Sequence, residues 1–242
     1  MNAIKGILFD KDGTILDNDL LWGSVGNDVA DSMAEVYCLT PDERRSVLRA
    51  IGLDGSKLLA NSPLASGTVG DVTDAVEAAL CACGKDKQAM AALKQQVTDA
   101  VECAIQKNAH LIRPLGNVRR LFDFLKSRRI AIGLATADLY NTTMICLNQL
   151  GIGEDFQFIG TDDGRTRPKP SPDLLESFCA TCGLDSREVA VVGDSVVDMQ
   201  MGLNGGAGLL VAIVPERDEN QPSAKDAQYV IETVEELIPL FS

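Results

Sequence analysis

The sequence predicts an α/β fold, with a doubly wound, mostly parallel sheet and an inserted helical domain. Short, continuous apolar runs alternate with stretches of helical period in the second half of the chain. Runs of this kind are typical of strands that helices cover on both faces. A long Ala-rich stretch of helical character separates the first apolar run from that second half. We therefore expect an α/β core at 1–16 and 112–242 and a helical domain at 17–111.

The first part of the chain is predicted to hold one strand, followed by helices. The strand is expected at 4–9 (IKGILF). A helix should begin after Thr40-Pro41, because a threonine followed by a proline is a typical helix start. The other elements expected in this part are a loop at 61–68, a helix at 75–83 and a long helix from Asp86 to about His110.

Beyond Pro114 the pattern changes to an alternation of helices and strands. Glycines at the ends of several apolar segments mark the points where helices should stop. Helices are expected at 115–127, 139–150, 172–182, from Asp194 to near Gly205, and at 234–240. Strands are expected at 130–135, 156–159, 189–192, 209–214 and 229–231.

Composition and charge limit the possible partners. The chain has 242 residues and a formal net charge of −13, which disfavours a nucleic-acid or an anionic-membrane surface. The N-terminal segment lacks the features of a signal peptide, and no apolar run approaches the roughly 20 residues of a membrane span. The cysteine count is seven, and an odd number in a chain of this length favours free thiols in a reducing cytoplasm.

Polar residues follow the predicted strands at the points where those strands end. In a parallel α/β sheet, ligands bind beyond the carboxyl ends of the strands. The residues concerned are Asp10 and Asp12 after the first strand, Thr136 after the strand at 130–135, Asp194 and Asp198 after the strand at 189–192, and Lys169 in a proline-rich turn.

If these side chains meet, the carboxylates need a counter-charge, because like charges raise each other's pKa. A hard divalent ion supplies it, and a set of oxygen ligands points to Mg²⁺. Thr136 and Lys169 would then hold the remaining oxygens of a phosphoryl group. One carboxylate would act as nucleophile and its neighbour as general acid and base.

The ordered set of these residues resembles the motifs of the haloacid dehalogenase superfamily of phosphohydrolases. Asp10-Lys11-Asp12-Gly13-Thr14 matches its first motif, D-x-D-G-T. Thr136 matches the second motif and Lys169 resembles the third. Gly193-Asp194 with Asp198 resembles the fourth, G-D-x-x-x-D. The helical insert looks like the C1-type cap of phosphoglycolate phosphatase-like members of that superfamily.

The resemblance implies a role for each residue. Asp10 would attack phosphorus and form an aspartyl-phosphate, and Asp12 would protonate the leaving alcohol and then deprotonate water. Asp10, the backbone carbonyl of Asp12, and Asp194 would bind Mg²⁺. Thr136 and Lys169 would stabilise charge on the transferred group. Asp198 would either bind the metal through water or orient Lys169.

The expected activity is hydrolysis of a small phosphorylated metabolite, and alternatives stay open. A phosphomutase of the β-phosphoglucomutase type would use the same motifs. A receiver-like signalling module or a non-catalytic phosphate-binding protein would also place acids around a lysine. Lys11 departs from the usual pattern, which has an apolar residue at that position, and it either points into solvent or adds positive charge near the cleft.

Overall fold

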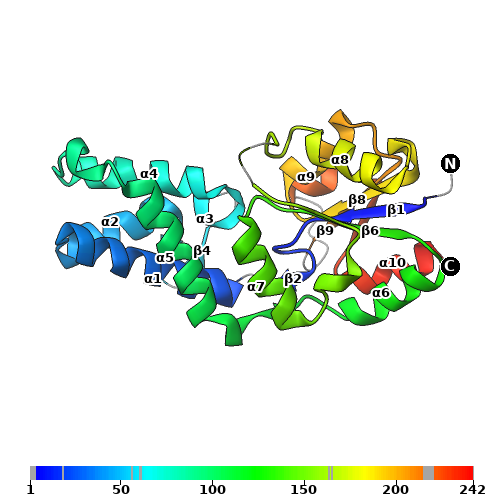
Figure 1. Cartoon of the computed structure of the whole chain (residues 1–242), viewed down its shortest axis with the longest axis horizontal. Coiled ribbons are helices and arrows are strands. Elements are labelled where there is room, and N and C mark those ends of the chain that lie inside the picture. Colours follow the sequence, from blue (N-terminus) through cyan, green and yellow to red (C-terminus); the bar gives the residue numbers. More distant parts are fainter. Residues whose placement is uncertain are drawn as a thin grey trace. The chain divides into compact units, whose positions relative to one another are not determined.

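The computed structural model describes residues 4–17, 19–55, 57–59, 62–162, 164, 166–214 and 221–241. The chain divides into two compact units. Unit 1 comprises Met1–Asp17, Arg113–Thr136 and Leu147–Ser242, and unit 2 comprises Asn18–Ile112 and Ala137–Cys146. Figure 1 shows the elements of both.

Unit 1 contains a sheet of six strands in the order β10-β9-β8-β1-β6-β7, and its strand pairs are parallel. In the register, Phe9 of β1 lies opposite Leu134 of β6 and Val192 of β8. The three central strands therefore end at one level, and the prediction of a parallel α/β sheet is confirmed. The strands are β1 (Gly6–Phe9), β6 (Ala131–Ala135), β7 (Phe158–Gly160), β8 (Val189–Gly193), β9 (Leu209–Ile213) and β10 (Tyr229–Ile231).

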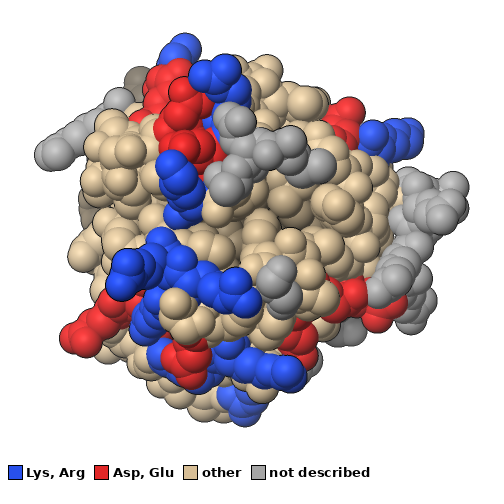
Figure 2. Space-filling view, turned by 90° about the vertical axis from the view of Figure 1, so that its right-hand side faces the viewer, with Lys and Arg blue, Asp and Glu red and all other residues tan. Residues whose placement is uncertain are grey.

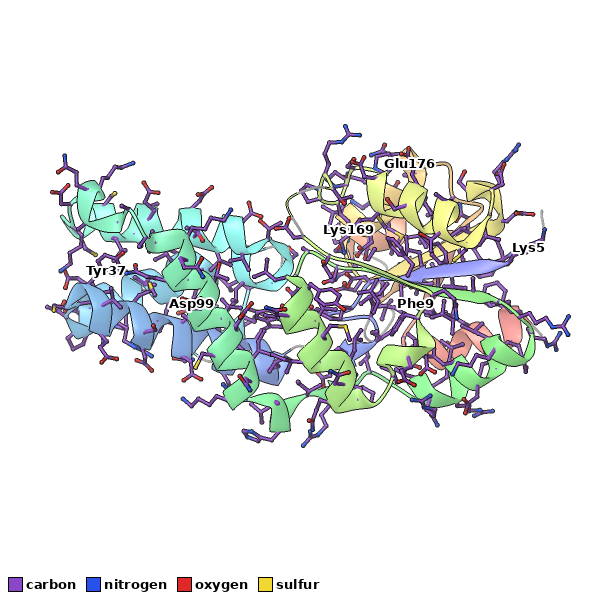
Figure 3. The ribbon with its side chains drawn as sticks, in the orientation of Figure 1. Lys5, Phe9, Tyr37, Asp99, Lys169 and Glu176 are labelled. Atoms are coloured by element: carbon purple, nitrogen blue, oxygen red, sulfur yellow. The ribbon has the colours of Figure 1, made fainter. Side chains whose placement is uncertain are left out.

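Helices cover both faces of this sheet (Figure 1). On one face lie α8 (Asp173–Cys182) and α9 (Val196–Asn204), and on the other lie α6 (Val118–Ser127) and α10 (Leu237–Leu240). Successive side chains of β1 serve the two faces, as strand geometry requires. Leu8 packs in one buried cluster with Phe178 of α8, whereas the ring of Phe9, labelled in Figure 3, lies 5.8 Å from that of Phe122 in α6.

The chain order of the strands creates a switch point at β1. From β1 the chain goes to β6 and β7 on one side, and it then crosses to β8, β9 and β10 on the other side. Helix α7 (Tyr140–Leu150) connects β6 to β7 and begins in unit 2. In open α/β sheets, ligands bind at such a switch point, beyond the carboxyl ends of the strands.

Unit 2 is mainly helical. Its longest helices, α1 and α5, are joined by a hydrogen bond from the Tyr37 hydroxyl (labelled in Figure 3) to Gln96 at 2.6 Å. Helix α2 begins after Thr40 as predicted, and Thr40 caps it in a capping box with Glu43. The interior of unit 2 is lined by apolar side chains such as Val97. The helices are α1 (Asp19–Tyr37), α2 (Pro41–Ile51), α3 (Pro63–Ser66), α4 (Val69–Ala82) and α5 (Leu93–Lys107).

Several predictions for individual elements were wrong in detail. The long helix expected from Asp86 is a 3-10 turn at Lys87–Met90 followed by α5, and the expected loop at 61–68 contains α3. Two antiparallel pairs of two-residue strands, which are too short to produce a periodic signal, were not predicted. They are β2 (Leu16–Asp17) with β5 (Arg113–Pro114), and β3 (Leu53–Asp54) with β4 (Lys57–Leu58).

The surface carries charges of both signs in spite of the negative total. Figure 2 shows Lys and Arg side chains next to Asp and Glu side chains in groups toward the top and bottom of one face. Ion pairs of unit 1 include Lys5 with Glu188 at 2.6 Å. For the part of the chain that the structure describes, each helix is too short or too polar to cross a lipid bilayer.

Candidate active site

Asp10 lies at the carboxyl end of the central strand. Its backbone N–H donates to the carbonyl of Val192 at 2.8 Å, which extends the pairing of β1 with β8 by one residue. The residue is 8% exposed. Burial raises the pKa of Asp10 to about 7, with the charge of Lys169 opposing the shift and that of Asp198 adding to it. A carboxyl group with this pKa is poised between its two protonation states near neutral pH.

A tight turn follows Asp10 and brings the first and fourth motifs together. The carbonyl of Lys11 accepts hydrogen bonds from the backbone N–H groups of Ile15 and Leu16, both at 3.0 Å. Gly13 has a φ of +73°, and a Cβ atom there would lie 2.4 Å from Oδ2 of Asp194. Only glycine allows both this backbone conformation and this close approach.

Lys169 connects the third motif to the first and the fourth. Its ammonium lies 2.6 Å from Oδ1 of Asp10, 2.7 Å from Oδ1 of Asp198 and 3.3 Å from the carbonyl of Ala135. The side chain is only 6% exposed. Burial alone would lower the pKa of Lys169, but the charges of Asp10 and Asp198 raise it above its ordinary value. The ammonium therefore stays charged. Figure 3 labels Lys169 on the α8 side of the sheet.

Asp198 is held at both carboxylate oxygens. Oδ1 accepts from Lys169, and Oδ2 accepts from the Ser195 hydroxyl at 2.5 Å and the Ser195 backbone N–H at 3.1 Å. Ser195 and Asp198 form the capping box at the N-terminus of α9. Asp198 is 1% exposed. Of the two roles expected for Asp198, this arrangement favours orientation of Lys169.

Asp194 completes a group of three carboxylates. Oxygen atoms of Asp10, Asp194 and Asp198 all lie within 4.8 Å of one another. Burial raises the pKa of Asp194 well above its ordinary value, and the charges of Asp10 and Asp198 raise it further. Among the described residues, no ion pair involving Asp194 is found. Buried acids with this deficit of positive charge fit a hard divalent cation, which oxygen ligands bind.

Asp12 lies beside a different lysine. Its Oδ2 is 3.0 Å from Nζ of Lys11, and the side chains of Asp12 and Lys11 are 13% and 0% exposed. The expectation that Lys11 points into solvent is therefore wrong, because its ammonium is buried and paired with the second acid of the motif. The carboxylate of Asp12 does not belong to the group formed by Asp10, Asp194 and Asp198.

Thr136 follows the neighbouring strand β6. It is 3% exposed, and its backbone N–H donates to the carbonyl of Gly160 on β7 at 3.0 Å. The residue before it, Ala135, is the one whose carbonyl accepts from Lys169. Thr136 is thus the neighbour in sequence of a residue that contacts Lys169.

The predicted residues therefore gather at one edge of the unit 1 sheet, with Asp10, Lys169 and Asp198 in direct contact. Ser195 was missed as a member of this network. Its signal was present in the sequence, because a serine followed three residues later by an acid before an apolar run is the pattern of a capping box. That pattern predicts the helix start, but it does not show that the acid also contacts a lysine from another segment.

The comparison with known families agrees with this arrangement. Residues 4–206 match the model of the haloacid dehalogenase-like hydrolases. The chain belongs to this family. The resemblance inferred from the four motifs is thereby confirmed, and so is the prediction that the chain is a hydrolase of this superfamily.

Several known proteins are similar to this hydrolase over nearly its whole length. It is 25% identical over 236 residues to pyrophosphatase PpaX of Bacillus velezensis, covering 97% of this chain and 95% of that protein. It is 24% identical over 243 residues to N-acetylmuramic acid 6-phosphate phosphatase of Pseudomonas aeruginosa, covering 97% and 93%. A solved structure from Haemophilus somnus, described as a predicted phosphoglycolate phosphatase, shares the fold with a TM-score of 0.73 and 17% identity, and all of both chains is covered.

Proposed function

We propose that the protein is a Mg²⁺-dependent phosphatase that hydrolyses a small phosphorylated metabolite through an aspartyl-phosphate on Asp10. The observation that carries this proposal is the position of Asp10, which is buried at the switch point with Lys169 at 2.6 Å and two further carboxylates close by. Relatives named as phosphatases of small phosphorylated compounds support the substrate class. The free thiols of the described cysteines suit a reducing cytoplasm.

In the first half-reaction, a carboxylate oxygen of Asp10 attacks phosphorus. The bond between phosphorus and the leaving oxygen breaks, its electron pair goes to that oxygen, and Asp12 donates a proton there. In the second half-reaction, water attacks phosphorus and gives its proton to Asp12. The bond from Asp10 to phosphorus then breaks, which restores the Asp10 carboxylate and releases phosphate.

The remaining groups position the reactants and balance charge. Asp10, Asp194 and the backbone carbonyl of Asp12 would hold Mg²⁺, which neutralises charge on the phosphoryl oxygens when bound. Lys169 and Thr136 would donate to the same oxygens, where prearranged donors supply much of the catalysis. Asp198 orients Lys169. We assign substrate selection to residues 17–111, as a C1-type cap of phosphoglycolate phosphatase-like enzymes.

Purified protein tests this proposal directly. We expect it to hydrolyse p-nitrophenyl phosphate with Mg²⁺ and to lose that activity in EDTA. Asp10→Asn should lose on the order of 10⁵-fold or more in kcat, because the nucleophile is gone. A matched control is Asp185→Asn, since Asp185 is an exposed helix-cap residue paired with Arg187 outside the site, and it should keep full activity.

The covalent intermediate and the substrate need separate measurements. Acid-quenched enzyme should carry a phosphoryl group on the peptide that contains Asp10, as detected by mass spectrometry. A panel of phosphoglycolate, pyrophosphate, N-acetylmuramic acid 6-phosphate and sugar phosphates should then identify the substrate. Full activity in Asp10→Asn would refute the mechanism, and transfer of the phosphoryl group to a sugar phosphate instead of water would identify a phosphomutase.

A further inference from the structure

Lys11 is unusual because its side chain is completely buried. It is 0% exposed and is among the largest fully buried side chains of the described residues. A buried ammonium costs free energy unless it is paired and hydrogen-bonded. An apolar residue would fill this space without that cost, so the presence of a lysine calls for an explanation beyond packing.

The partner of the ammonium is the proposed general acid and base. Nζ of Lys11 lies 3.0 Å from Oδ2 of Asp12, and the Asp12 side chain is the more exposed of the two, at 13% against 0%. The Lys11 backbone is also fixed, because its carbonyl accepts hydrogen bonds from the N–H groups of Ile15 and Leu16. A buried ammonium on a fixed backbone therefore lies beside the partly exposed carboxylate of Asp12.

We propose that Lys11 is a positioning residue that holds the Asp12 carboxylate in the orientation needed for proton exchange with the substrate. This inference rests on the proposed function. In the first half-reaction the proton passes from Asp12 to the leaving oxygen as its bond to phosphorus breaks. In the second, the attacking water returns a proton to Asp12. Lys11 keeps its own protons throughout and acts only by fixing the rotation of the carboxylate.

The dependence of the rate on the leaving group reveals this role. An alkoxide is strongly basic and needs a proton as it departs, whereas p-nitrophenolate is weakly basic and departs with little help. A misoriented Asp12 should therefore slow the first half-reaction of an alkyl phosphate far more than that of p-nitrophenyl phosphate. A residue with a merely structural role would affect both substrates equally.

The test compares Lys11→Met with the unaltered full-length protein. The substrates are p-nitrophenyl phosphate and the alkyl phosphate of the panel that the unaltered protein hydrolyses fastest. We expect kcat/KM, which reports the first half-reaction alone, to fall roughly 100-fold for the alkyl phosphate and less than about fivefold for p-nitrophenyl phosphate. Lys11→Arg, which keeps the charge, should restore part of the alkyl phosphate activity.

Further variants separate this role from a loss of folding. Methionine has a similar length and fills the same space, but Lys11→Met leaves the largely buried Asp12 carboxylate without its ammonium. It should therefore fold but unfold at a lower temperature, and the assays are run well below that temperature. Lys11→Gln is a second variant, which keeps a hydrogen-bond donor and should show the same selectivity to a smaller degree. The control is Lys126→Met, which removes an ion-pair partner of the buried Asp155 outside the site and should lower stability without changing the ratio of the two activities.

The outcomes distinguish the two proposals. Equal losses of kcat/KM on both substrates, or an unchanged kcat/KM of Lys11→Met for the alkyl phosphate, would overturn the role of Lys11 and leave the phosphatase proposal intact. If the unaltered protein hydrolyses no alkyl phosphate and no p-nitrophenyl phosphate with Mg²⁺, the proposed function itself fails.

Discussion

Two buried lysines lie beside the two acids of the first motif, and their surroundings differ in charge. Lys169 contacts both Asp10 and Asp198, and Asp194 belongs to the same group of acids, so one ammonium faces three carboxylates among the described residues. Nζ of Lys11 is 3.0 Å from Oδ2 of Asp12, so in this contact one ammonium faces one carboxylate.

Asp10 and Asp12 are two positions apart in the sequence, but their surroundings differ in the charge that they still need. The surroundings of Asp10 favour a further positive charge, since burial and neighbouring acids raise the pKa values of Asp10 and Asp194. The proposed function places a divalent cation and the nucleophile there. The contact of Lys11 with Asp12 joins one ammonium to one carboxylate, and the proposed function assigns to Asp12 the loss and gain of one proton. The following predictions test that division.

Removal of Lys169 should have the largest effect. We expect Lys169→Met to lower kcat by about 10²- to 10³-fold, because a donor to the phosphoryl oxygens is lost. It should also lower the free energy of unfolding by about 3–5 kcal/mol, since Asp10 and Asp198 stay buried without their ammonium. Steady-state kinetics and urea denaturation measure the two effects.

A lysine outside the site provides the control for Lys169. Lys107 is exposed and pairs with Asp28 at 2.7 Å. Lys107→Met should leave both the free energy of unfolding and kcat nearly unchanged, because solvent screens an exposed ion pair. If Lys169→Met had as small an effect as this control, the excess of carboxylates around Lys169 would have no functional meaning.

Magnesium binding should depend on pH through Asp10. The pKa of Asp10 is about 7 in the folded protein without metal, against an ordinary value of 3.8. Between these values the folded state holds a proton that the unfolded chain has lost, so rising pH lowers the stability of the metal-free protein. Mg²⁺ displaces that proton, and its dissociation constant should fall about tenfold per pH unit as the pH rises toward 7.

Calorimetry and thermal unfolding, with and without Mg²⁺, test this linkage. We expect Mg²⁺ to stabilise the protein more at a pH of about 7.5 than at about 5.5. Asp10→Asn removes one of the two acids whose pKa values are raised and should weaken the pH dependence of binding, whereas Asp185→Asn should preserve it. An equal effect of Mg²⁺ at both pH values in the unaltered protein would contradict the charge deficit inferred around Asp10.

The location of the site could largely be predicted from sequence. Continuous apolar runs predict parallel strands, and the carboxyl ends of parallel strands lie together at one edge of the sheet. This reason applies to Asp10, Thr136 and Asp194, which each follow a predicted strand. Lys169 lies in a proline-rich turn, and the motif resemblance joins it to them. The role of Asp198 could not be settled, since it depends on which oxygen faces Lys169. The position of Lys11 was also open, because strand alternation does not say where a long, flexible side chain ends after a tight turn.

Replacement of Ser195 should have the smallest effect and tests how Lys169 is held. Ser195→Ala removes the hydroxyl that donates to Oδ2 of Asp198 at 2.5 Å, and loss of such a cap costs about 1 kcal/mol in the free energy of unfolding.

We expect a few-fold decrease in kcat at unchanged KM, because Asp198 then restrains Lys169 less firmly, and Ser195→Thr should restore the rate. Thr68→Ala removes a similar capping box at α4 in unit 2 and should show the loss of stability alone. If both alanine variants left kcat unchanged, the capping box at α9 would serve the helix only, and Lys169 would be held by the acids without help from Ser195.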